Sequence, residues 1–387
     1  MRTVTPWNSN NKRMPDRIYG NKKTDIAIIG GGITGVSAAY HLARRGIKTV
    51  LIEAKRLGGG SSGKSFGLLV SGTEHDLKEA VHKFGWPHAK DIWQATRKAL
   101  RQLELTLKKE KIKCGFQKIS SLNLSFTSKD LRLLKDEYNL LKKAGFLVKW
   151  LDKKELDKKI KSSAKAAIQN LSDAVINPQL LVENLAKKIR PKNLNLFELS
   201  PALKISKKNN LFHIKTDKGV IIAKKVILAT ESFTPALLKT WGFNWANLLP
   251  QSLIIKRHKG IIIRPSSKTW FKNYWPGKEM MWNFGTQYSC FRKRDDGRII
   301  FLSDIAMKDS FKNFFGDAKL NIESAWDCQV AGFRDELPRI GEIPGNPNIY
   351  FAGGYKGHGL VFGFLAGIIL SDLITGRKNR VSKLFSF

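Results

Sequence analysis

The first strong hydrophobic pattern of the chain runs from residue 25 to residue 53. An apolar run at 26–29 ends in three glycines at 30–32, and apolar residues then recur at helical spacing at 36, 39, 42 and 43. Gly46 suits a helix end, and a second apolar run at 49–52 leads to Glu53. The pattern predicts a strand, a helix and a second strand, with a glycine turn after the first strand.

Apolar runs and helical patterns continue along the rest of the chain. Strands are predicted at residues 122–126, 146–150, 194–199, 211–216, 226–230, 253–255, 260–263, 298–302 and 348–353. Helices are predicted at residues 76–109, 129–144, 178–186 and 360–373. The run at 226–230 is apolar throughout, which is typical of a strand buried in a parallel sheet, whereas the runs between 250 and 325 suggest an antiparallel sheet.

This order of elements predicts an α/β fold with two discontinuous domains. We expect a Rossmann-like domain with a parallel sheet, made of residues 23–75, 163–240 and 326–387. We expect a second α+β domain with a mainly antiparallel sheet, made of residues 76–162 and 241–325. The apolar stretch 360–373 is interrupted by glycines and by Asp372 and is short for a bilayer, so we expect a buried helix and no transmembrane segment.

The glycine turn has the spacing G-x-G-x-x-G, which is formed by Gly30, Gly32 and Gly35. In a dinucleotide site the first glycine permits the tight turn, the second lets a pyrophosphate approach the backbone, and the third lets the helix pack on the strand. The helix N-terminus then offers N–H groups to phosphate, and an acidic residue such as Glu53 can bind ribose hydroxyls. The alternative is an ordinary glycine turn, and the surrounding strand, helix and Glu53 favour the nucleotide site.

The chain of 387 residues has a formal net charge of +36. Such a charge attracts nucleic acids or anionic membrane surfaces without specificity. Its basic residues form no stripe with interleaved aromatic residues, and no nucleic-acid motif appears, so we interpret the charge as lysine-rich solvated faces. We therefore expect no specific nucleic-acid partner, and peripheral contact with an anionic membrane stays an alternative.

The sequence indicates neither a disulfide framework nor a metal site. Cys114, Cys290 and Cys328 lie far apart and are odd in number, which argues against a disulfide framework and a zinc site. The histidines form no H-x-x-x-H pair, so we expect no metal site. Residues 1–22 are polar, contain Pro6 and Pro15, and suggest a loose arm with no signal peptide, so a cytoplasmic location is expected.

Several spaced motifs resemble the D-amino acid oxidase-like flavoproteins, which include sarcosine oxidase, glycine oxidase and gamma-glutamylputrescine oxidoreductase. The motifs are Ser61-Ser62-Gly63-x-Ser65-x-Gly67, Ile176-x-Pro178, Leu228-Ala229-Thr230, Asp335-x-Leu337-Pro338-x-Ile340-Gly341, Tyr350-Phe351-Ala352-Gly353-Gly354 and Gly357-His358-Gly359. The resemblance covers nearly the whole chain after residue 22 and is nearest to the gamma-glutamylputrescine oxidoreductase branch. Lys64, Ser65 and Phe66 depart from the S-G-R-N-G-G motif of that branch.

The resemblance implies FAD as the cofactor. The residues implied to bind it are Gly30, Gly32, Ile33, Thr34, Gly35, Glu53, Ala54, Gly60, Ser61, Ser62, Ser65, Gly67, Leu203, Ala229, Thr230, Gly353, Gly354, Gly357, His358 and Gly359. Cys328 lies seven residues before Asp335, the spacing of the flavin-linking cysteine in sarcosine oxidase. We expect non-covalent FAD, with a covalent link through Cys328 as the alternative, because a buried cysteine often serves only as a small apolar residue.

The resemblance also implies the chemistry, in which a C–H bond beside an amine gives a hydride to the flavin and yields an imine. Candidates for the catalytic residues that line the substrate are Tyr355, Lys356, His358, Arg257 and Trp282. Each has a structural alternative. His358 lies between two glycines and can simply hydrogen-bond its turn, and Arg257 lies in a basic run that can face solvent.

The expected substrate is an amine, either a polyamine or an amine conjugate. Sarcosine oxidase holds its substrate carboxylate with two basic residues, which correspond by position to Gly67 and Val361 here. Neither can pair with an anion, and an unpaired buried carboxylate is costly. Three alternatives stay open: a simple amino acid such as sarcosine, glycine or a D-amino acid; another flavin reaction such as tRNA modification; and a non-catalytic flavin-binding or assembly subunit.

The electron acceptor is expected to be oxygen or a quinone or protein. The oxygen-activating lysine of sarcosine oxidase corresponds roughly to the strand at residues 297–301, where this chain has no lysine, although Arg298 is close. We therefore expect slow reaction with oxygen.

Overall fold

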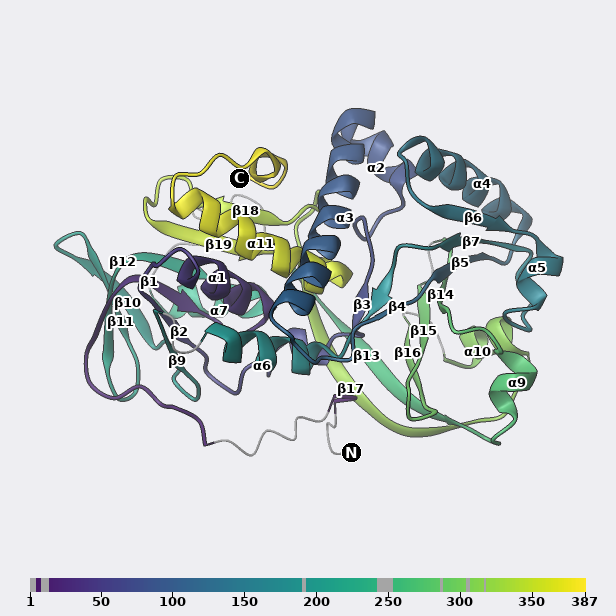
Figure 1. Cartoon of the computed structure of the whole chain (residues 1–387), viewed down its shortest axis with the longest axis horizontal. Helices are drawn as coiled ribbons and strands as arrows, with labels where there is room; N and C mark the ends of the chain where they lie inside the picture. The colour runs from purple at the N-terminus through teal and green to yellow at the C-terminus, as the bar shows by residue number, and fades with distance from the viewer. Residues whose placement is uncertain are drawn as a thin grey trace.

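The computed structural model describes residues 5–7, 14–189, 193–241, 253–285, 288–303, 307–316 and 318–387. Two large sheets and one small sheet lie in a row and are covered by helices (Figure 1). The predicted α/β fold, with one mainly parallel and one mainly antiparallel sheet, is confirmed.

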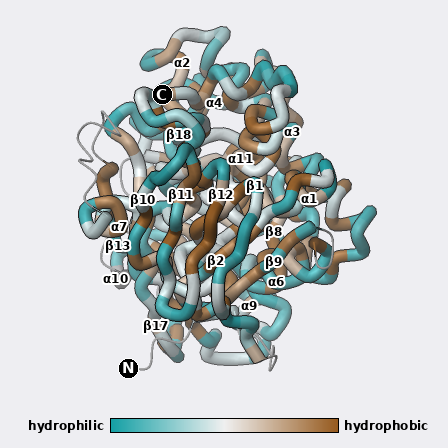
Figure 2. The backbone as a smooth tube through the Cα atoms, turned by 90° about the vertical axis from the view of Figure 1, so that its left-hand side faces the viewer, coloured by the Kyte–Doolittle hydropathy of each residue, from teal (hydrophilic) through white to brown (hydrophobic). Residues whose placement is uncertain are grey.

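The first sheet has a parallel centre in which β19, β12, β1, β2 and β9 follow one another. Strands β10 and β11 extend it antiparallel beside the start of β12, and β18 pairs antiparallel with β19. The bounds are β1 Lys22–Ile29, β2 Thr49–Ile52, β9 Leu194–Phe197, β10 Lys204–Lys208, β11 Leu211–Lys215, β12 Val220–Leu228, β18 Arg339–Glu342 and β19 Ile349–Gly353. Figure 2 shows β10, β11, β12, β1 and β2 side by side.

Burial explains why the central strands are apolar. All four residues of β2 are buried, as are the last residues of β1 and β12, because helices or loops cover both faces of this part of the sheet. Parallel strands have their carboxyl ends at one edge, so the segments that follow β1, β2 and β12 meet there.

Helices α1 (Ile33–Ala43), α6 (Pro178–Ile189), α11 (Gly359–Ile374) and α3 (Trp86–Lys109) pack together beside the first sheet. Helix α11 approaches α1 closely, since a Cβ atom on Gly367 would lie 2.2 Å from Ser37 Oγ. By length and composition one helix among the described residues, Lys356–Ile374, could cross a membrane, but most of it is buried inside the fold. This agrees with the expected buried helix.

The second sheet has the order β17-β13-β16-β15-β14-β5-β7-β6. Its neighbours are antiparallel apart from β14 and β5, which run parallel. The bounds are β5 Ser121–Ser125, β6 Val148–Leu151, β7 Ala166–Asn170, β13 Ile254–Pro265, β14 Met280–Asn283, β15 Ser289–Lys293, β16 Ile299–Ser303 and β17 Leu320–Gly332. The small third sheet joins β3 (Leu68–Leu69), β8 (Ala174–Val175) and β4 (Gln117–Lys118).

The described residues form further helices outside this first group. They are α2 Leu77–Phe84, α4 Ser128–Lys143, α5 Lys153–Asp157, α7 Thr234–Thr240, α9 Trp270–Tyr274 and α10 Met307–Phe315, with short 3₁₀ turns η1 Ser62–Lys64, η2 Glu231–Phe233, η3 Lys356–His358 and η4 Arg380–Leu384. The single helix predicted at 76–109 is wrong in one respect. Gly85 adopts φ +77° and separates α2 from α3, because a left-handed residue cannot continue a helix.

The long ladder between β13 and β17 connects the two large sheets. It begins where Ile254 pairs with Gly332, and Gly332 also bridges to Tyr355 beside the first sheet. Strand pairing places β7 and all of β17 in the second sheet, although 163–170 and 326–332 were assigned to the Rossmann-like domain. The division into two domains itself stays a prediction.

Candidate functional site

A cavity of about 1390 Å³ opens at the carboxyl ends of β1, β2 and β12 and extends beneath the second sheet. Three segments from the sequence motifs line it: the glycine turn after β1, the serine-rich loop at residues 60–67, and the turn at residues 355–359. Their convergence follows from the parallel strand order, which brings these ends to one edge.

Close packing around the turn after β1 requires glycine at two of its positions. Gly30 has φ +113°, and a Cβ atom there would lie 2.4 Å from the carbonyl oxygen of Ala229. A Cβ atom on Gly35 would lie 1.9 Å from the carbonyl oxygen of Gly30, so this glycine lets α1 pack against the turn. Gly35 itself does not line the cavity, and its role is this packing.

The N-terminus of α1 faces the cavity at Gly32, Ile33 and Thr34. The N-cap residue, Gly32, has no side chain to cap this end, and no acidic residue occupies the first turn, so the positive end of the helix dipole is not neutralised by the helix itself. The Ile33 N–H donates to Ser62 Oγ at 3.0 Å, which ties the serine-rich loop to the helix start. This end of α1 offers an anion N–H groups and a favourable dipole.

Glu53 follows β2 at the same edge. Its Oε2 accepts from the Gly31 N–H and its Oε1 accepts from the Lys55 N–H, both at 2.7 Å. Burial raises the pKa of Glu53, and the two backbone hydrogen bonds oppose that shift. The carboxylate is thereby fixed beside the glycine turn, where a ribose hydroxyl can reach it.

The serine-rich loop is held in place by a buried guanidinium that sequence reasoning missed. Arg292 Nη1 donates to the carbonyl oxygens of Phe66, Gly67 and Ile176 at 2.9–3.0 Å. Arg292 is 6% exposed, on β15 of the second sheet. Arg292 begins the basic run 292–294, and nothing in the sequence distinguishes it from its neighbours for this role.

The N-terminal segment also contacts this loop, so the expectation of a loose arm is wrong at residues 5–7. Trp7 is 6% exposed, and its Nε1 donates to the carbonyl oxygen of Ser65 at 2.8 Å. The indole ring lies 5.0 Å from the guanidinium carbon of Arg292 and 5.3 Å from that of Arg294. Trp7 is therefore an integral part of the packing behind the loop.

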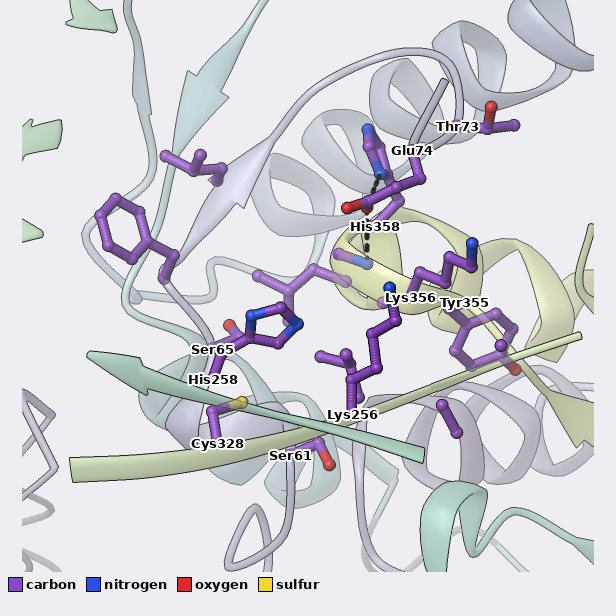
Figure 3. A pocket seen from close by; sticks show the side chains of 18 of the residues that line it. Ser61, Ser65, Thr73, Glu74, Lys256, His258, Cys328, Tyr355, Lys356 and His358 are labelled. Carbon is purple, nitrogen blue, oxygen red and sulfur yellow. Dashed lines mark hydrogen bonds and ion pairs between the residues drawn. The ribbon is translucent and has the colours of Figure 1, made fainter. Parts of the chain in front are cut away.

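The turn at residues 355–359 carries Tyr355, Lys356 and His358 into the cavity wall (Figure 3). Thr34 Oγ1 donates to the Tyr355 hydroxyl at 3.2 Å, which joins this turn directly to the glycine turn. Lys356 forms an ion pair with Glu336, and the Gly357 N–H donates to Glu74 Oε2 at 3.1 Å. His358 Nδ1 lies 3.9 Å from Glu74 Oε2, and burial lowers the pKa of His358, an effect that Glu74 opposes.

Glu231, three residues after the end of β12 at Leu228, is another residue that the sequence did not single out. Its Oε1 accepts long hydrogen bonds from the N–H groups of Gly354 and Tyr355, at 3.2 and 3.3 Å. Burial raises the pKa of Glu231 to about 7, against the effect of its backbone hydrogen bonds. The residue has φ +47°, an uncommon value for a non-glycine residue.

Arg257 of β13 was expected to line the substrate, but two other residues of this strand line the cavity. Lys256 and His258 line the cavity, whereas Arg257 does not, because successive residues of a strand point to opposite faces. In Figure 3 the side chains of Lys256 and His258 extend toward the turn that carries Tyr355 and His358. His258 pairs in register with Cys328 of β17, which also lines the cavity.

Most of the expected site residues meet in this one cavity. Those that line it are Gly30, Gly32, Ile33, Thr34, Glu53, Ala54, Gly60, Ser61, Ser62, Ser65, Gly67, Ala229, Thr230, Trp282, Cys328, Tyr355, Lys356, Gly357, His358 and Gly359. Besides Gly35 and Arg257, the exceptions are Leu203, Gly353 and Gly354. Leu203 is 44% exposed, and its neighbours Pro201 and Ala202 line the cavity instead.

No group of three or more metal-ligand side chains is placed to hold a metal ion in the described part of the chain. Cys114, Cys290 and Cys328 are all free and buried. Burial raises the pKa of the Cys328 thiol to about 11; Lys64 opposes this shift and Glu231 adds to it. The thiol form is therefore favoured at neutral pH.

The family model described as FAD dependent oxidoreductase matches residues 25–373 of this chain. The chain belongs to the FAD dependent oxidoreductase family. It is similar to the probable oxidoreductase OrdL of Haemophilus influenzae, with 28% identity over 373 residues, 92% of this chain and 84% of that protein. Gamma-glutamylputrescine oxidoreductase of Escherichia coli is 25% identical over 392 residues, 96% of this chain and 88% of that protein.

Among solved structures, glycine oxidase from Geobacillus kaustophilus is similar with a TM-score of 0.77 and 18% identity, and the match covers 94% of this chain and 98% of that one. This likeness concerns the fold. The family match confirms the expected family and its FAD cofactor.

The residues of the cavity suit FAD. The uncapped start of α1 would hold the pyrophosphate, and Glu53 would hold the ribose of the adenosine half. The tight approach of Gly30, Gly32 and Gly35 to neighbouring atoms leaves no room for larger side chains at this turn. Gly359 begins α11, whose N-terminus also lines the cavity and favours negative charge there.

Proposed function

We propose that this FAD-dependent oxidoreductase oxidises the C–N bond of an amine, a polyamine or an amine conjugate, to an imine. Bound FAD supplies the hydride acceptor for the C–H bond beside the nitrogen. The chain's residues have to admit the amine, favour its unprotonated form and exclude competing water.

The observation that carries this proposal is the nature of the residues at the two expected carboxylate anchors. Gly67 offers only its backbone, and its carbonyl oxygen is already bound by Arg292. Val361 is 2% exposed and does not line the cavity. A substrate carboxylate at these two points would be buried without a partner, at a cost of several kcal/mol.

The charge of the cavity walls agrees with a cationic substrate. The whole chain has 68 lysines and arginines against 32 aspartates and glutamates. In the cavity walls, carboxylic acids slightly outnumber lysines and arginines. An ammonium group therefore meets a less repulsive field inside the cavity than over the rest of the molecule.

His358 is suited to receive the proton that the substrate ammonium must lose. Its lowered pKa keeps the imidazole neutral near pH 7, and Glu74 Oε2, 3.9 Å from Nδ1, stabilises the protonated ring once it forms. Tyr355, whose hydroxyl is bound by Thr34, holds the turn that presents His358.

A simple amino acid is the second candidate substrate, and one observation favours it. Lys256 points into the cavity and has no ion-pair partner among the described residues, so it can bind a carboxylate. Lys356 is less available for this purpose, because Glu336 pairs with it.

Steady-state assays with a dye acceptor decide between the two candidates. We expect the kcat/KM of primary or secondary alkylamines to exceed that of N-methylglycine and of D-alanine. A higher kcat/KM for either amino acid would refute the amine proposal. We also expect the reduced enzyme to react slowly with oxygen. Arg298, the basic residue near the expected position of the oxygen-activating lysine, is engaged in ion pairs with Asp296 and Glu323.

A further inference from the structure

The cavity extends beyond the flavin segments to a region between α4 and the second sheet. Its walls there are largely apolar and come from α3, α4, the turn after α4 and strand β7, through Trp93, Leu133, Leu141, Phe146 and Ile168. Apolar walls of this kind suit a hydrocarbon chain.

A buried carboxyl group, Asp173, lies in the wall of this region. It is 1% exposed and directly precedes β8, whose Ala174 pairs with Leu69 of β3. This pairing places Asp173 near Val70 and Ser71, which follow the serine-rich loop and line the same cavity. Asp173 is thus next to the flavin segments in the fold, but belongs to none of the motifs that bind FAD.

The hydrogen bonding of Asp173 is incomplete. Ser121 Oγ donates to Oδ2 at 2.5 Å, but Oδ1 has no hydrogen-bond partner among the described residues. No cation pairs with it in the described part of the chain. Burial raises the pKa of Asp173 to about 7, against the opposing effects of Ser121 and of the Ser71 backbone. A buried carboxyl group that lacks a partner is costly, and a ligand that supplies one gains that free energy.

A second buried carboxyl group in this region, Glu137, is already engaged. Its Oε1 accepts from the Leu77 N–H at 2.9 Å and its Oε2 accepts from the Lys78 N–H at 2.8 Å. Glu137 therefore serves the N-terminus of α2, whereas Asp173 keeps one buried oxygen without a hydrogen-bond partner among the described residues.

We propose that Asp173 binds the distal ammonium group of an alkyl diamine or polyamine whose other amine is oxidised. The alkyl chain lies along the apolar wall, and the ammonium donates to the unpartnered Oδ1. A monoamine of the same chain length lacks this contact and leaves the carboxyl group unpaired. The inference rests on the proposed amine oxidation and names the substrate within that class.

The test compares α,ω-diamines with n-alkyl monoamines of equal chain length, on FAD-loaded wild type, Asp173→Asn and the control Asp217→Asn. Asparagine keeps an oxygen that can accept from Ser121. Asp217 is an exposed carboxylate in the turn between β11 and β12, outside the cavity. We expect wild type and control to prefer diamines in kcat/KM by about 10- to 100-fold. Asp173→Asn should lose this preference through a higher KM and keep its monoamine activity.

Equal kcat/KM for diamines and monoamines in wild type would overturn the inference, and so would a full diamine preference in folded Asp173→Asn. If Asp173→Asn loses its flavin spectrum or its melting transition, the wild-type comparison decides alone. Oxidation of amines without a diamine preference refutes only this inference, whereas no oxidation of any amine refutes the proposed function as well.

Discussion

Burial sets the chemistry of single side chains around the cavity. Cys328 and His358 are held in their neutral forms near pH 7, and Glu231 keeps its proton up to about that pH, because the cost of desolvating a charge outweighs the nearby hydrogen bonds and charges. Sequence reasoning found Cys328 and His358 through motif position. It could not find Glu231, because nothing in the sequence indicates how deeply a residue after a strand end is buried.

The state of Cys328 leads to a prediction about the FAD linkage. A thiol with a pKa of about 11 is a poor nucleophile at neutral pH, since the thiolate is the reactive form. Acid precipitation should therefore leave the yellow colour in the supernatant, and Cys328→Ser should bind FAD like wild type. Colour retained in the wild-type pellet and lost from the Cys328→Ser pellet would demonstrate the covalent link instead.

Glu231 leads to a prediction about pH and stability. The folded chain keeps the proton of Glu231 up to about pH 7, whereas the unfolded chain releases it near the ordinary pKa of 4.5. Stability is therefore lost as pH rises from the unfolded to the folded pKa, by on the order of 3 kcal/mol. In denaturant titrations at saturating FAD, Glu231→Gln should lose less stability than wild type across this window, while Asp217→Asn should match wild type. Parallel curves for Glu231→Gln and wild type would contradict this account.

At the scale of elements, two contacts between segments that are far apart in sequence shape the site. The N-terminal segment supports the serine-rich loop through Trp7, and α11 packs against α1, which carries the glycine turn. Many of the helices and strands followed from hydrophobic period and glycine positions, but β7, β14, β15 and β17 of the second sheet were not predicted. Their contacts did not follow, because neither Trp7 in a polar arm nor Arg292 in a short basic run has a local pattern that reveals its partners.

Trp7→Ala should weaken FAD binding. It removes the hydrogen bond to Ser65 and the ring between Arg292 and Arg294, so the loop loses its support. We expect the Kd for FAD, measured by flavin fluorescence quenching, to rise about 10-fold. Trp150→Ala, in β6 of the second sheet and outside the cavity, is the matched control. It should lower the melting temperature and leave the Kd unchanged; an equal rise in Kd for both variants would show that Trp7 acts only through general stability.

Gly367→Ala should destabilise the contact of α1 with α11. The added methyl group would lie 2.2 Å from Ser37 Oγ and 2.5 Å from the Ser37 carbonyl carbon, so the helices must separate. Overpacking of this kind costs about 1–3 kcal/mol. Thermal unfolding should show a lower Tm for Gly367→Ala, with little change for Gly341→Ala, where a Cβ atom meets nothing within 4 Å. An unchanged Tm for Gly367→Ala would mean that the helices are less tightly packed than described.

At the scale of the whole molecule, two sheets enclose one cavity between a nucleotide-binding edge and a roof of antiparallel strands. The fold class and the FAD segments were predictable, because G-x-G-x-x-G, the serine-rich loop and the final glycine turn are local patterns that the parallel sheet brings together. The substrate side was less predictable. On β13 the alternation of side chains places Lys256 and His258 in the cavity in place of Arg257, and the sequence does not reveal which face of that strand is covered.

The most direct test of the account is anaerobic titration of the FAD-loaded protein with a panel of amines, followed by the bleaching of the flavin absorbance. We predict that alkylamines, and diamines above all, reduce the flavin, and that N-methylglycine and D-alanine reduce it less efficiently. A flavin that stays oxidised with every amine, or that only the simple amino acids bleach, would contradict the account.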